Sequence, residues 1–155
     1  MIIRQATIDE MFALWYKFYT SDFFADNIQR GNAEFWAMEY HARLIGELYI
    51  FKELHDRDFA DGATTAYLYG FRIEELMRGK GLGTMLMDRV LHRLKALNFK
   101  YVTVGVELEH EENIRLYKRM GFTETIKTVT ENPCDVDENF IPTYGPAYLL
   151  LRKAL

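Results

Sequence analysis

The chain of 155 residues is long enough to form one domain with a buried core, and its 49% content of apolar residues excludes a disordered polypeptide. A formal net charge of −4 without a long basic run argues against a nucleic-acid-binding surface and is compatible with a cationic substrate. The sequence contains no apolar run of membrane-spanning length, no signal-peptide pattern at its start and one cysteine, so we expect a cytoplasmic protein without a membrane partner.

The first part of the chain predicts two helices and four strands. Apolar residues from Ile8 to Phe18 recur at steps of three and four, which predicts a helix over residues 8–19. A second, short helix is expected over residues 22–30, just before a glycine. Segments rich in β-branched and aromatic residues predict strands over residues 2–5, 35–40, 44–51 and 63–75.

The second part predicts a strand–helix–strand unit followed by antiparallel strands. An apolar stripe from Leu82 to Leu97 predicts an amphipathic helix, and another helix is expected over residues 113–120. Residues 131–146 are typical of an acidic loop, and strands are predicted over residues 101–106, 122–129 and 148–151. The element order indicates an α+β fold in which one right-handed crossover joins two parallel strands of a mostly antiparallel sheet.

The segment "MRGKGLGTML", residues 77–86, places three glycines where the predicted helix begins. A helix start offers free backbone N–H groups and the positive end of the helix dipole. Glycines let a phosphate approach that backbone closely, and Arg78 and Lys80 add positive charge. The segment therefore predicts an anion-binding site, with a ligand-free turn as the alternative.

Two nucleotide-binding patterns fit this segment less well. A nucleotide-hydrolysing P-loop is excluded, because Glu74 stands at the position of its first glycine and Gly81 at the position of its Ser or Thr. A dinucleotide fingerprint requires Gly-x-Gly-x-x-Gly and an acid about 20 residues later. The spacing here is Gly-x-Gly-x-Gly, although Glu107 ends the next predicted strand, so a dinucleotide is the weaker alternative.

The pattern Arg78-x-x-Gly81-x-Gly83 resembles the acyl-CoA pyrophosphate loop of the GCN5-related N-acetyltransferases (GNAT). A second segment, "NIRLYKRMGF" at residues 113–122, resembles the asparagine, the tyrosine-bearing helix and the Gly-Phe step of the same family. One predicted helix and one predicted strand separate the two segments, as in the family. The resemblance implies a single acyl-CoA N-acyltransferase domain over residues 1–155, with a mixed, mostly antiparallel central sheet of about six or seven strands and about four helices.

The resemblance also implies an enzyme that uses acetyl-CoA as co-substrate. The strand end before the loop binds pantetheine and, through the Ile73 N–H, polarises the thioester carbonyl. Asn113 contacts the cofactor, and Tyr117 lies near its sulfur and protonates the leaving thiolate, with simple packing as the alternative role for Tyr117. The residues implied to contact acetyl-CoA are Phe71, Arg72, Ile73, Arg78, Gly79, Lys80, Gly81, Leu82, Gly83, Thr84, Asn113 and Tyr117.

The general base is the part of the reaction that the sequence predicts least well. Many relatives carry a carboxylate or a histidine inside the strand before the loop, but the inner positions here are Tyr67, Leu68, Tyr69 and Phe71. The nearest carboxylates belong to Glu74 and Glu75, and Glu75 stands where the family has a proline. These two glutamates are the candidate catalytic bases, with a solvated loop edge as the alternative.

The acceptor is expected to be a small cationic amine. The segments "YTSDFFADN" and "ENPCDVDENF", which correspond to the acceptor pocket of the family, combine aromatic residues with carboxylates. A protein N-terminus or lysine is an alternative acceptor, and a non-catalytic acyl-CoA-binding module is an alternative function.

The histidines are scattered without metal-ligand spacing, so no metal is predicted. The strands expected near the C-terminus are compatible with a homodimer.

Overall fold

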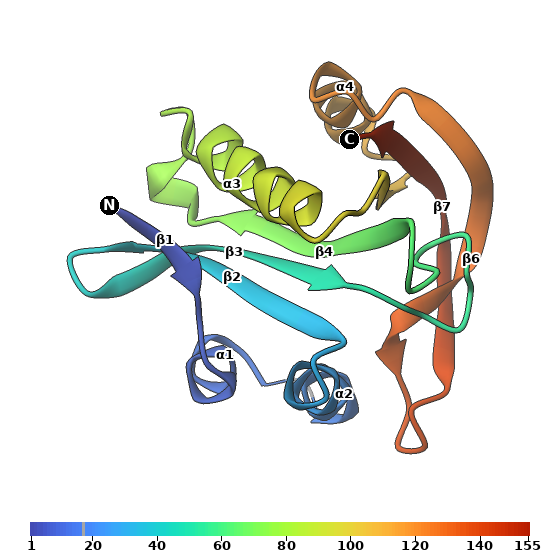
Figure 1. Cartoon of the computed structure of the whole chain (residues 1–155), viewed down its shortest axis with the longest axis horizontal. Helices are drawn as coiled ribbons and strands as arrows, with labels where there is room; N and C mark the ends of the chain where they lie inside the picture. Colours follow the sequence, from blue (N-terminus) through green and yellow to red (C-terminus); the bar gives the residue numbers. More distant parts are fainter. Residues whose placement is uncertain (17) are drawn as a thin grey trace.

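The computed structural model describes residues 1–16 and 18–155, and its seven strands form one sheet in the order β1-β2-β3-β4-β5-β7-β6 (Figure 1). Every neighbouring pair in this sheet is antiparallel except β4 and β5. The mixed, mostly antiparallel sheet predicted from the sequence is therefore confirmed. The strands are β1 (Ile2–Gln5), β2 (Ala33–Tyr40), β3 (Arg43–Phe51), β4 (Thr65–Ile73), β5 (Tyr101–Glu107), β6 (Glu124–Val136) and β7 (Pro142–Ala154).

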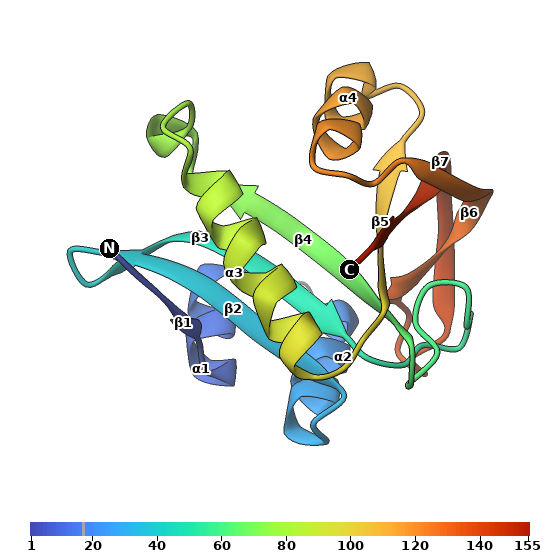
Figure 2. The same cartoon turned by 45° about the horizontal axis from the view of Figure 1, so that its top comes forward.

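Helices cover both faces of the sheet (Figures 1 and 2). On one face lie α1 (Ile8–Leu14) and α2 (Phe18–Gln29), and on the other lie α3 (Leu82–Ala96) and α4 (Glu111–Arg119). A single 3₁₀ turn, η1 (Glu75–Met77), follows β4 and precedes the glycine-rich segment. None of the helices in the described part of the chain has the length and apolar character needed to cross a membrane.

The sheet separates two buried apolar clusters. Leu86 and Val90 of α3 pack with Leu48 of β3 in the first cluster, and all three side chains are fully buried. Phe24 of α2 and Phe51 of β3 belong to the second cluster, on the opposite face. Burying aromatic and aliphatic side chains on both faces makes β2 and β3 a rigid base for the strands that follow.

The prediction of one continuous helix over residues 8–19 is wrong, because the helix breaks at Trp15 and residues 18 and 19 belong to α2. The helix α1 ends at Leu14, because Trp15 adopts an extended backbone with φ −159° and ψ 152°, and α2 begins at Phe18. In this conformation the indole Nε1 of Trp15 donates a hydrogen bond of 3.0 Å to the hydroxyl of Tyr49 on β3. The spacing of apolar residues alone predicts that the helix continues through Trp15, and it contains no sign of this contact with a distant strand. Residue 17, which belongs to the predicted helix, lies outside the described residues.

The acidic loop predicted over residues 131–146 is also wrong, because most of this segment forms the hairpin of β6 and β7. The connection is short: the Asp137 carboxylate accepts hydrogen bonds from the backbone N–H groups of Asn139 and Ile141. Pro133 lies inside β6 where the pairing register shifts between Asn132 and Val136. Prolines are typical of loops, but a register shift tolerates the missing backbone donor within a strand.

The parallel strands β4 and β5 are paired over only part of their length. Residues 65–68 of β4 pair with residues 101–104 of β5, whereas no pairing continues toward the C-terminal ends of the two strands. Figure 2 shows the two strands diverging from this short ladder. The sheet is thereby divided into a β1–β4 part and a β5–β7 part, with a gap between them at the end of β4.

Candidate active site

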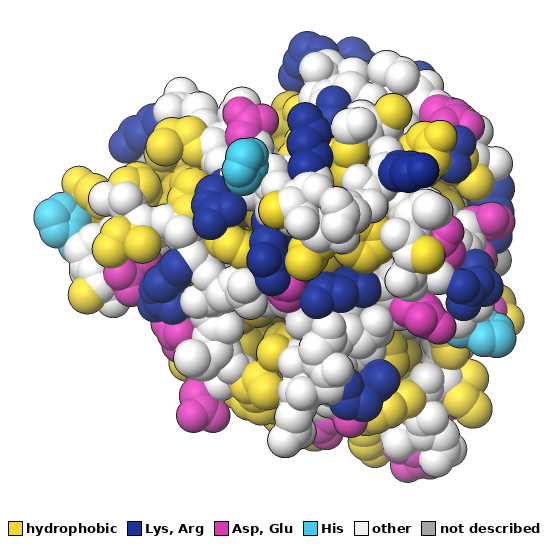
Figure 3. Space-filling model, in the orientation of Figure 1, with side chains coloured by type: hydrophobic (Ala, Val, Ile, Leu, Met, Phe, Trp, Pro, Cys, Tyr) yellow, Lys and Arg dark blue, Asp and Glu magenta, His cyan; other side chains and the backbone are white. Residues whose placement is uncertain are grey.

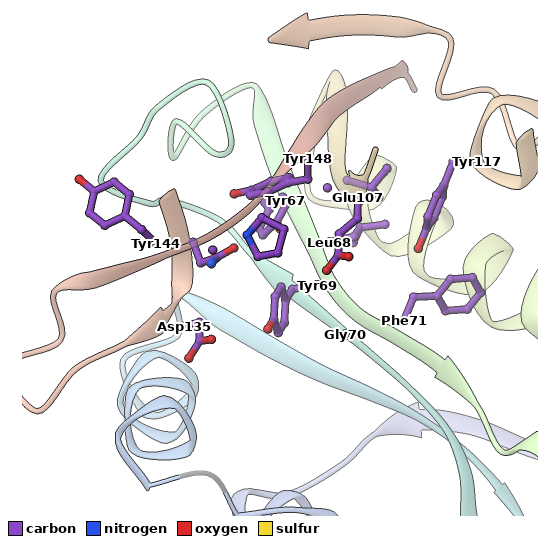
Figure 4. A pocket seen from close by; sticks show the side chains of 15 residues that line it. Tyr67, Leu68, Tyr69, Gly70, Phe71, Glu107, Tyr117, Asp135, Tyr144 and Tyr148 are labelled. Atoms are coloured by element: carbon purple, nitrogen blue, oxygen red, sulfur yellow. The ribbon is translucent and has the colours of Figure 1, made fainter. Parts of the chain in front are cut away.

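A cavity of about 500 Å³ lies at the gap between β4 and β5, and we call it the gap cavity. In Figure 4, Phe71 and Tyr117 lie at one end of this cavity and Asp135 and Tyr144 at the other, with Tyr69 between them. The remaining walls come from β4, β5 and the β6–β7 hairpin. Strands from both parts of the sheet therefore contribute side chains to one space.

A second cavity, of about 550 Å³, lies beside the glycine-rich segment, and we call it the loop cavity. Phe71 and Tyr117 line both cavities, so the loop cavity and the gap cavity adjoin at these two aromatic rings. The structure brings together all the predicted cofactor residues except Lys80 around the loop cavity, namely Phe71, Arg72, Ile73, Arg78, Gly79, Gly81, Leu82, Gly83, Thr84, Asn113 and Tyr117.

The start of α3 forms an open anion-binding position in the loop cavity. Gly81 is the N-cap residue and adopts a left-handed backbone with φ 77° and ψ 7°, which glycine permits without strain. No side chain caps this end, and the first turn of α3 contains no acidic residue. The exposed N–H groups and the helix dipole therefore favour a phosphate at this position.

Gly83 has a different reason to be glycine. A Cβ atom at Gly83 would lie 3.2 Å from Cζ of Phe71. The absence of a side chain therefore lets the first turn of α3 pack closely against the end of β4. This contact holds the loop and the strand end together around the loop cavity.

The end of β4 directs backbone donors into the gap. The Glu74 N–H donates to the Ile45 carbonyl of β3 at 2.7 Å. Because successive N–H groups of a strand alternate in direction, the Ile73 N–H points away from β3, toward the unpaired side of β4. The Ile73 carbonyl accepts a hydrogen bond of 2.9 Å from Nε of Arg78, which anchors the glycine-rich segment to the strand end. An N–H in this orientation is suited to stabilise a developing oxyanion.

Tyr117 lies on α4 where the two cavities adjoin. Its ring contacts the rings of Phe71 and Phe122, with centroid distances of 6.4 and 5.8 Å. Burial raises the pKa of the Tyr117 phenol to about 12. The hydroxyl therefore keeps its proton at neutral pH and can act as a proton donor. Asn113, one helical turn earlier, is exposed and lines the loop cavity but not the gap cavity.

The two predicted bases lie outside both cavities. The helical turn η1 contains Glu75, which is exposed. Glu74 accepts a hydrogen bond from Arg43, and this bond lowers the pKa of the Glu74 carboxyl below its ordinary value. A carboxylate that is stabilised in its charged form is a weaker base. The structure therefore does not bring Glu74 or Glu75 together with Tyr117.

The sequence analysis missed a buried carboxylate, Glu47 of β3. Its side chain is 7% exposed and lines a third cavity of about 400 Å³, which we call the Glu47 cavity. This cavity is formed by Leu14, Trp15, Thr20, Glu47, Tyr49, Tyr69, Gly70 and Arg72. One sequence signal was available: Glu47 is the only charged residue among the inner positions of an otherwise apolar strand, "LIGELYIF". Nothing in the sequence indicates its partners, which come from distant segments.

A glycine in β4 separates the Glu47 cavity from the gap cavity. Both cavities are lined by Tyr69 and Gly70. Gly70 has a positive φ of 70° at a register shift between β3 and β4, and a Cβ atom there would lie 3.1 Å from the Tyr49 ring. The two cavities therefore adjoin at Tyr69 and Gly70.

Basic side chains gather on one visible part of the surface. Figure 3 shows Lys and Arg side chains gathered over the part of the molecule around α3, with apolar side chains between them. A positive surface beside the open start of α3 attracts a polyanion such as a nucleotide-linked pyrophosphate. Within residues 1–16 and 18–155, no group of three His, Cys, Asp or Glu side chains is placed to hold a metal ion.

The comparison with protein families agrees with this arrangement. Residues 3–122 match the model of the Acetyltransferase (GNAT) family. The match covers well over half of the chain, so the chain belongs to that family. No curated protein matches the sequence.

Solved structures share the fold at low sequence identity. A ribosomal-protein-alanine N-acetyltransferase from Brucella melitensis superposes with a TM-score of 0.70 at 17% identity, covering 100% of both chains. A GNAT family acetyltransferase from Elizabethkingia anophelis with acetyl-CoA bound gives 0.63 at 18% identity, covering 99% of this chain and 97% of that chain. A spermidine N-acetyltransferase chimera from Vibrio cholerae and hSSAT gives 0.69 at 14% identity, with coverage of 99% and 96%.

Proposed function

We propose that this chain transfers an acetyl group from acetyl-CoA directly to the amino group of a small cationic acceptor. The observation that carries the proposal is the pair of adjoining cavities at the unpaired ends of β4 and β5, which meet at Phe71 and Tyr117. Membership of the acetyltransferase family and the acetyl-CoA in one similar structure support the choice of cofactor. In this proposal, residues 1–155 act as one acyl-CoA N-acyltransferase domain.

In the proposed reaction, the loop cavity holds the cofactor. Backbone N–H groups of residues 78–84 bind the pyrophosphate, and residues 71–73 bind the pantetheine arm. The Ile73 N–H stabilises the oxyanion that forms when the amine attacks the thioester carbon. Tyr117 then donates its proton to the leaving thiolate, which suits a phenol that is fully protonated at neutral pH.

The gap cavity is the proposed acceptor side. Its wall carries the carboxylates of Glu107 and Asp135 among several tyrosines. Carboxylates and aromatic faces both attract an ammonium group. The acceptor of this proposal is therefore a small amine with a positive charge. The cytoplasmic location of the protein stays a prediction.

The proposal is tested by mixing the purified chain with acetyl-CoA and a panel of amines while measuring the release of free CoA. The panel contains diamines, neutral amines, amino acids and a short peptide with a free N-terminus. Fastest release with diamines is expected. Preference for the peptide would support a protein acceptor, and preference for neutral or acidic amines would contradict the cationic acceptor.

Calorimetry with acetyl-CoA separates an enzyme from a binding module. Binding without turnover across the panel would support the non-catalytic alternative. Failure of the folded chain to bind CoA at millimolar concentration would overturn the whole assignment.

A further inference from the structure

Glu47 belongs to a hydrogen-bond chain that fixes the orientation of its carboxylate. The Trp15 Nε1–H donates to the Tyr49 hydroxyl at 3.0 Å. Since the indole can only donate, the Tyr49 hydroxyl proton remains free to donate to Oε2 of Glu47, at 3.4 Å. The carboxylate is therefore held at the wall of the Glu47 cavity by Tyr49 of β3 and, through it, by Trp15, which follows α1.

The other hydrogen-bond partner of Glu47, Arg72 of β4, is more exposed to solvent than Glu47. Nε of Arg72, the residue directly opposite on β4, donates to Oε1 of Glu47 at 3.0 Å. The Arg72 side chain is 50% exposed, whereas the Glu47 side chain is 7% exposed. A half-exposed guanidinium can move into water at little cost, while the buried carboxylate stays in place.

The walls around Glu47 suit the body of an organic amine. Trp15, Tyr49 and Tyr69 present aromatic rings to this cavity, and Leu14 adds an aliphatic side chain. Among the described residues that line this cavity, Glu47 and Arg72 carry charged side chains. An ammonium on an apolar or aromatic stem would therefore find one carboxylate and a largely aromatic surface.

We propose that Glu47 binds the ammonium group of the acceptor and takes its proton, and that the acceptor is a primary amine on an apolar or aromatic stem. This inference rests on the proposed function. The ammonium replaces the Arg72 guanidinium beside the carboxylate, in the Glu47 cavity, which meets the proposed acceptor side in the gap cavity at Tyr69 and Gly70.

The proton and the bonds balance in this scheme. The ammonium gives one proton to Glu47 and becomes a neutral amine with a free electron pair. That pair forms the new C–N bond at the thioester carbon, and the C–S bond breaks. The nitrogen loses its second proton to water, the thiolate receives the Tyr117 proton, and the products are the amide and free CoA. Glu47 then releases its proton to solvent and Tyr117 regains one from solvent, so that one proton is released in each turnover.

The other carboxylates near the gap are less suited to this role. Asp135 accepts a hydrogen bond of 2.8 Å from Thr20, on the far side of the gap cavity from Tyr117 (Figure 4). The Glu107 side chain is 48% exposed and pairs with His110 at 3.7 Å. Neither is among the described residues that line the Glu47 cavity.

The test compares three single variants with the wild-type protein. Glu47→Gln keeps the shape of the side chain and removes its charge, and Arg72→Gln removes the competing guanidinium. Glu34→Gln is the matched control, because Glu34 is also a buried strand carboxylate held by an arginine, Arg93, but lies outside the three cavities. The probes are 2-phenylethylamine and its neutral counterpart 2-phenylethanol, titrated by calorimetry into protein saturated with CoA.

The wild-type protein is expected to bind the amine in preference to the alcohol. Glu47→Gln should weaken amine binding by about tenfold or more, while Arg72→Gln should tighten it severalfold. The Kd for acetyl-CoA should stay unchanged in Glu47→Gln and Glu34→Gln. If the ion pair of Glu47 and Arg72 had only a structural role, Glu47→Gln and Arg72→Gln would weaken amine binding to the same extent. That result would overturn the proposal. Equal affinity of the wild-type protein for 2-phenylethylamine and 2-phenylethanol would overturn it as well.

Kinetics separate this inference from the proposed function. In a chain that acetylates amines, Glu47→Gln should lower kcat/KM for the amine by about 10²-fold, and an unchanged value would reject Glu47 while the transferase assignment stands. If the wild-type protein transfers no acetyl group but binds the amine in a Glu47-dependent way, the proposed function fails and the ammonium site is supported.

Discussion

The two sides of β4 are built in different ways. The loop cavity is formed largely by one continuous segment, residues 71–84, together with one face of α4, and its chemistry resides mainly in backbone N–H groups. The Glu47 cavity draws side chains from α1, α2, β3 and β4, and its chemistry resides in one carboxylate and several aromatic rings. Substitutions on the first side are therefore expected to change cofactor affinity, whereas substitutions on the second side should change acceptor use.

Tyr117, where the loop cavity and the gap cavity adjoin, should give the largest effect. Tyr117→Phe removes the proposed proton donor and retains the ring that packs against Phe71 and Phe122. We expect kcat to fall by about 10²-fold to 10³-fold, with the Kd for acetyl-CoA unchanged. Tyr101→Phe is the control, because Tyr101 lies on β5 beside Arg152 and outside the cavities. Unchanged kcat in Tyr117→Phe would assign the ring to packing alone.

Gly81 tests the loop side by itself. Gly81→Asp places a carboxylate at the open start of α3, where it opposes a bound pyrophosphate, and forces a non-glycine residue to φ 77°. The Kd for CoA should rise about 100-fold in calorimetry. Gly81→Asn is the control for backbone strain, since asparagine tolerates this conformation without adding charge, and it should lose much less affinity. Equal losses in the two variants would exclude a charge effect.

Gly70 tests the boundary between the two sides. Gly70→Ala combines a positive φ of 70° with a Cβ contact of 3.1 Å to the Tyr49 ring. We expect the free energy of unfolding to fall by about 2 kcal/mol and the KM for the amine to rise. Gly31→Ala has a similar φ of 77° and no atom within 4 Å of the added Cβ, so it isolates the cost of the backbone conformation. Identical urea-unfolding curves for the two variants would show that crowding at Tyr49 is harmless.

Glu74 should give the smallest effect. Its carboxylate is held by Arg43 and does not line either cavity at the gap. Glu74→Gln should therefore change kcat/KM by less than about twofold. A drop of tenfold or more would restore Glu74 as the general base and would weaken the case for Glu47.

Much of the fold and of the loop side could be predicted from the sequence, because the signals are local. The spacing of Arg78, Gly81 and Gly83 and the apolar stripe of α3 lie within one short stretch. The acceptor side could not be predicted in the same way. The break at Trp15 depends on its contact with Tyr49, and the importance of Glu47 depends on Arg72, which is distant in sequence. The strands over residues 122–129 and 148–151 were predicted, but the extension of β6 and β7 into residues 131–146 was missed, because Pro133 and its acidic neighbours are typical of loops, although a register shift accommodates them.

The short ladder between β4 and β5 has a thermodynamic consequence. Among the described residues, the ladder between β4 and β5 pairs residues 65–68 with 101–104 and does not continue toward the C-terminal ends of the strands. Backbone hydrogen-bonding groups beyond the ladder are therefore left for a ligand to satisfy. A pantetheine arm bound between β4 and β5 would take the hydrogen bonds that a neighbouring strand would otherwise make. Because only the folded chain offers this site, binding of the cofactor would stabilise the folded state. At a free concentration one hundred times its Kd, such a ligand adds about 2.7 kcal/mol to the free energy of unfolding. The melting temperature of this chain should therefore rise with the concentration of acetyl-CoA, so that its free energy of unfolding depends on how much free acetyl-CoA is present.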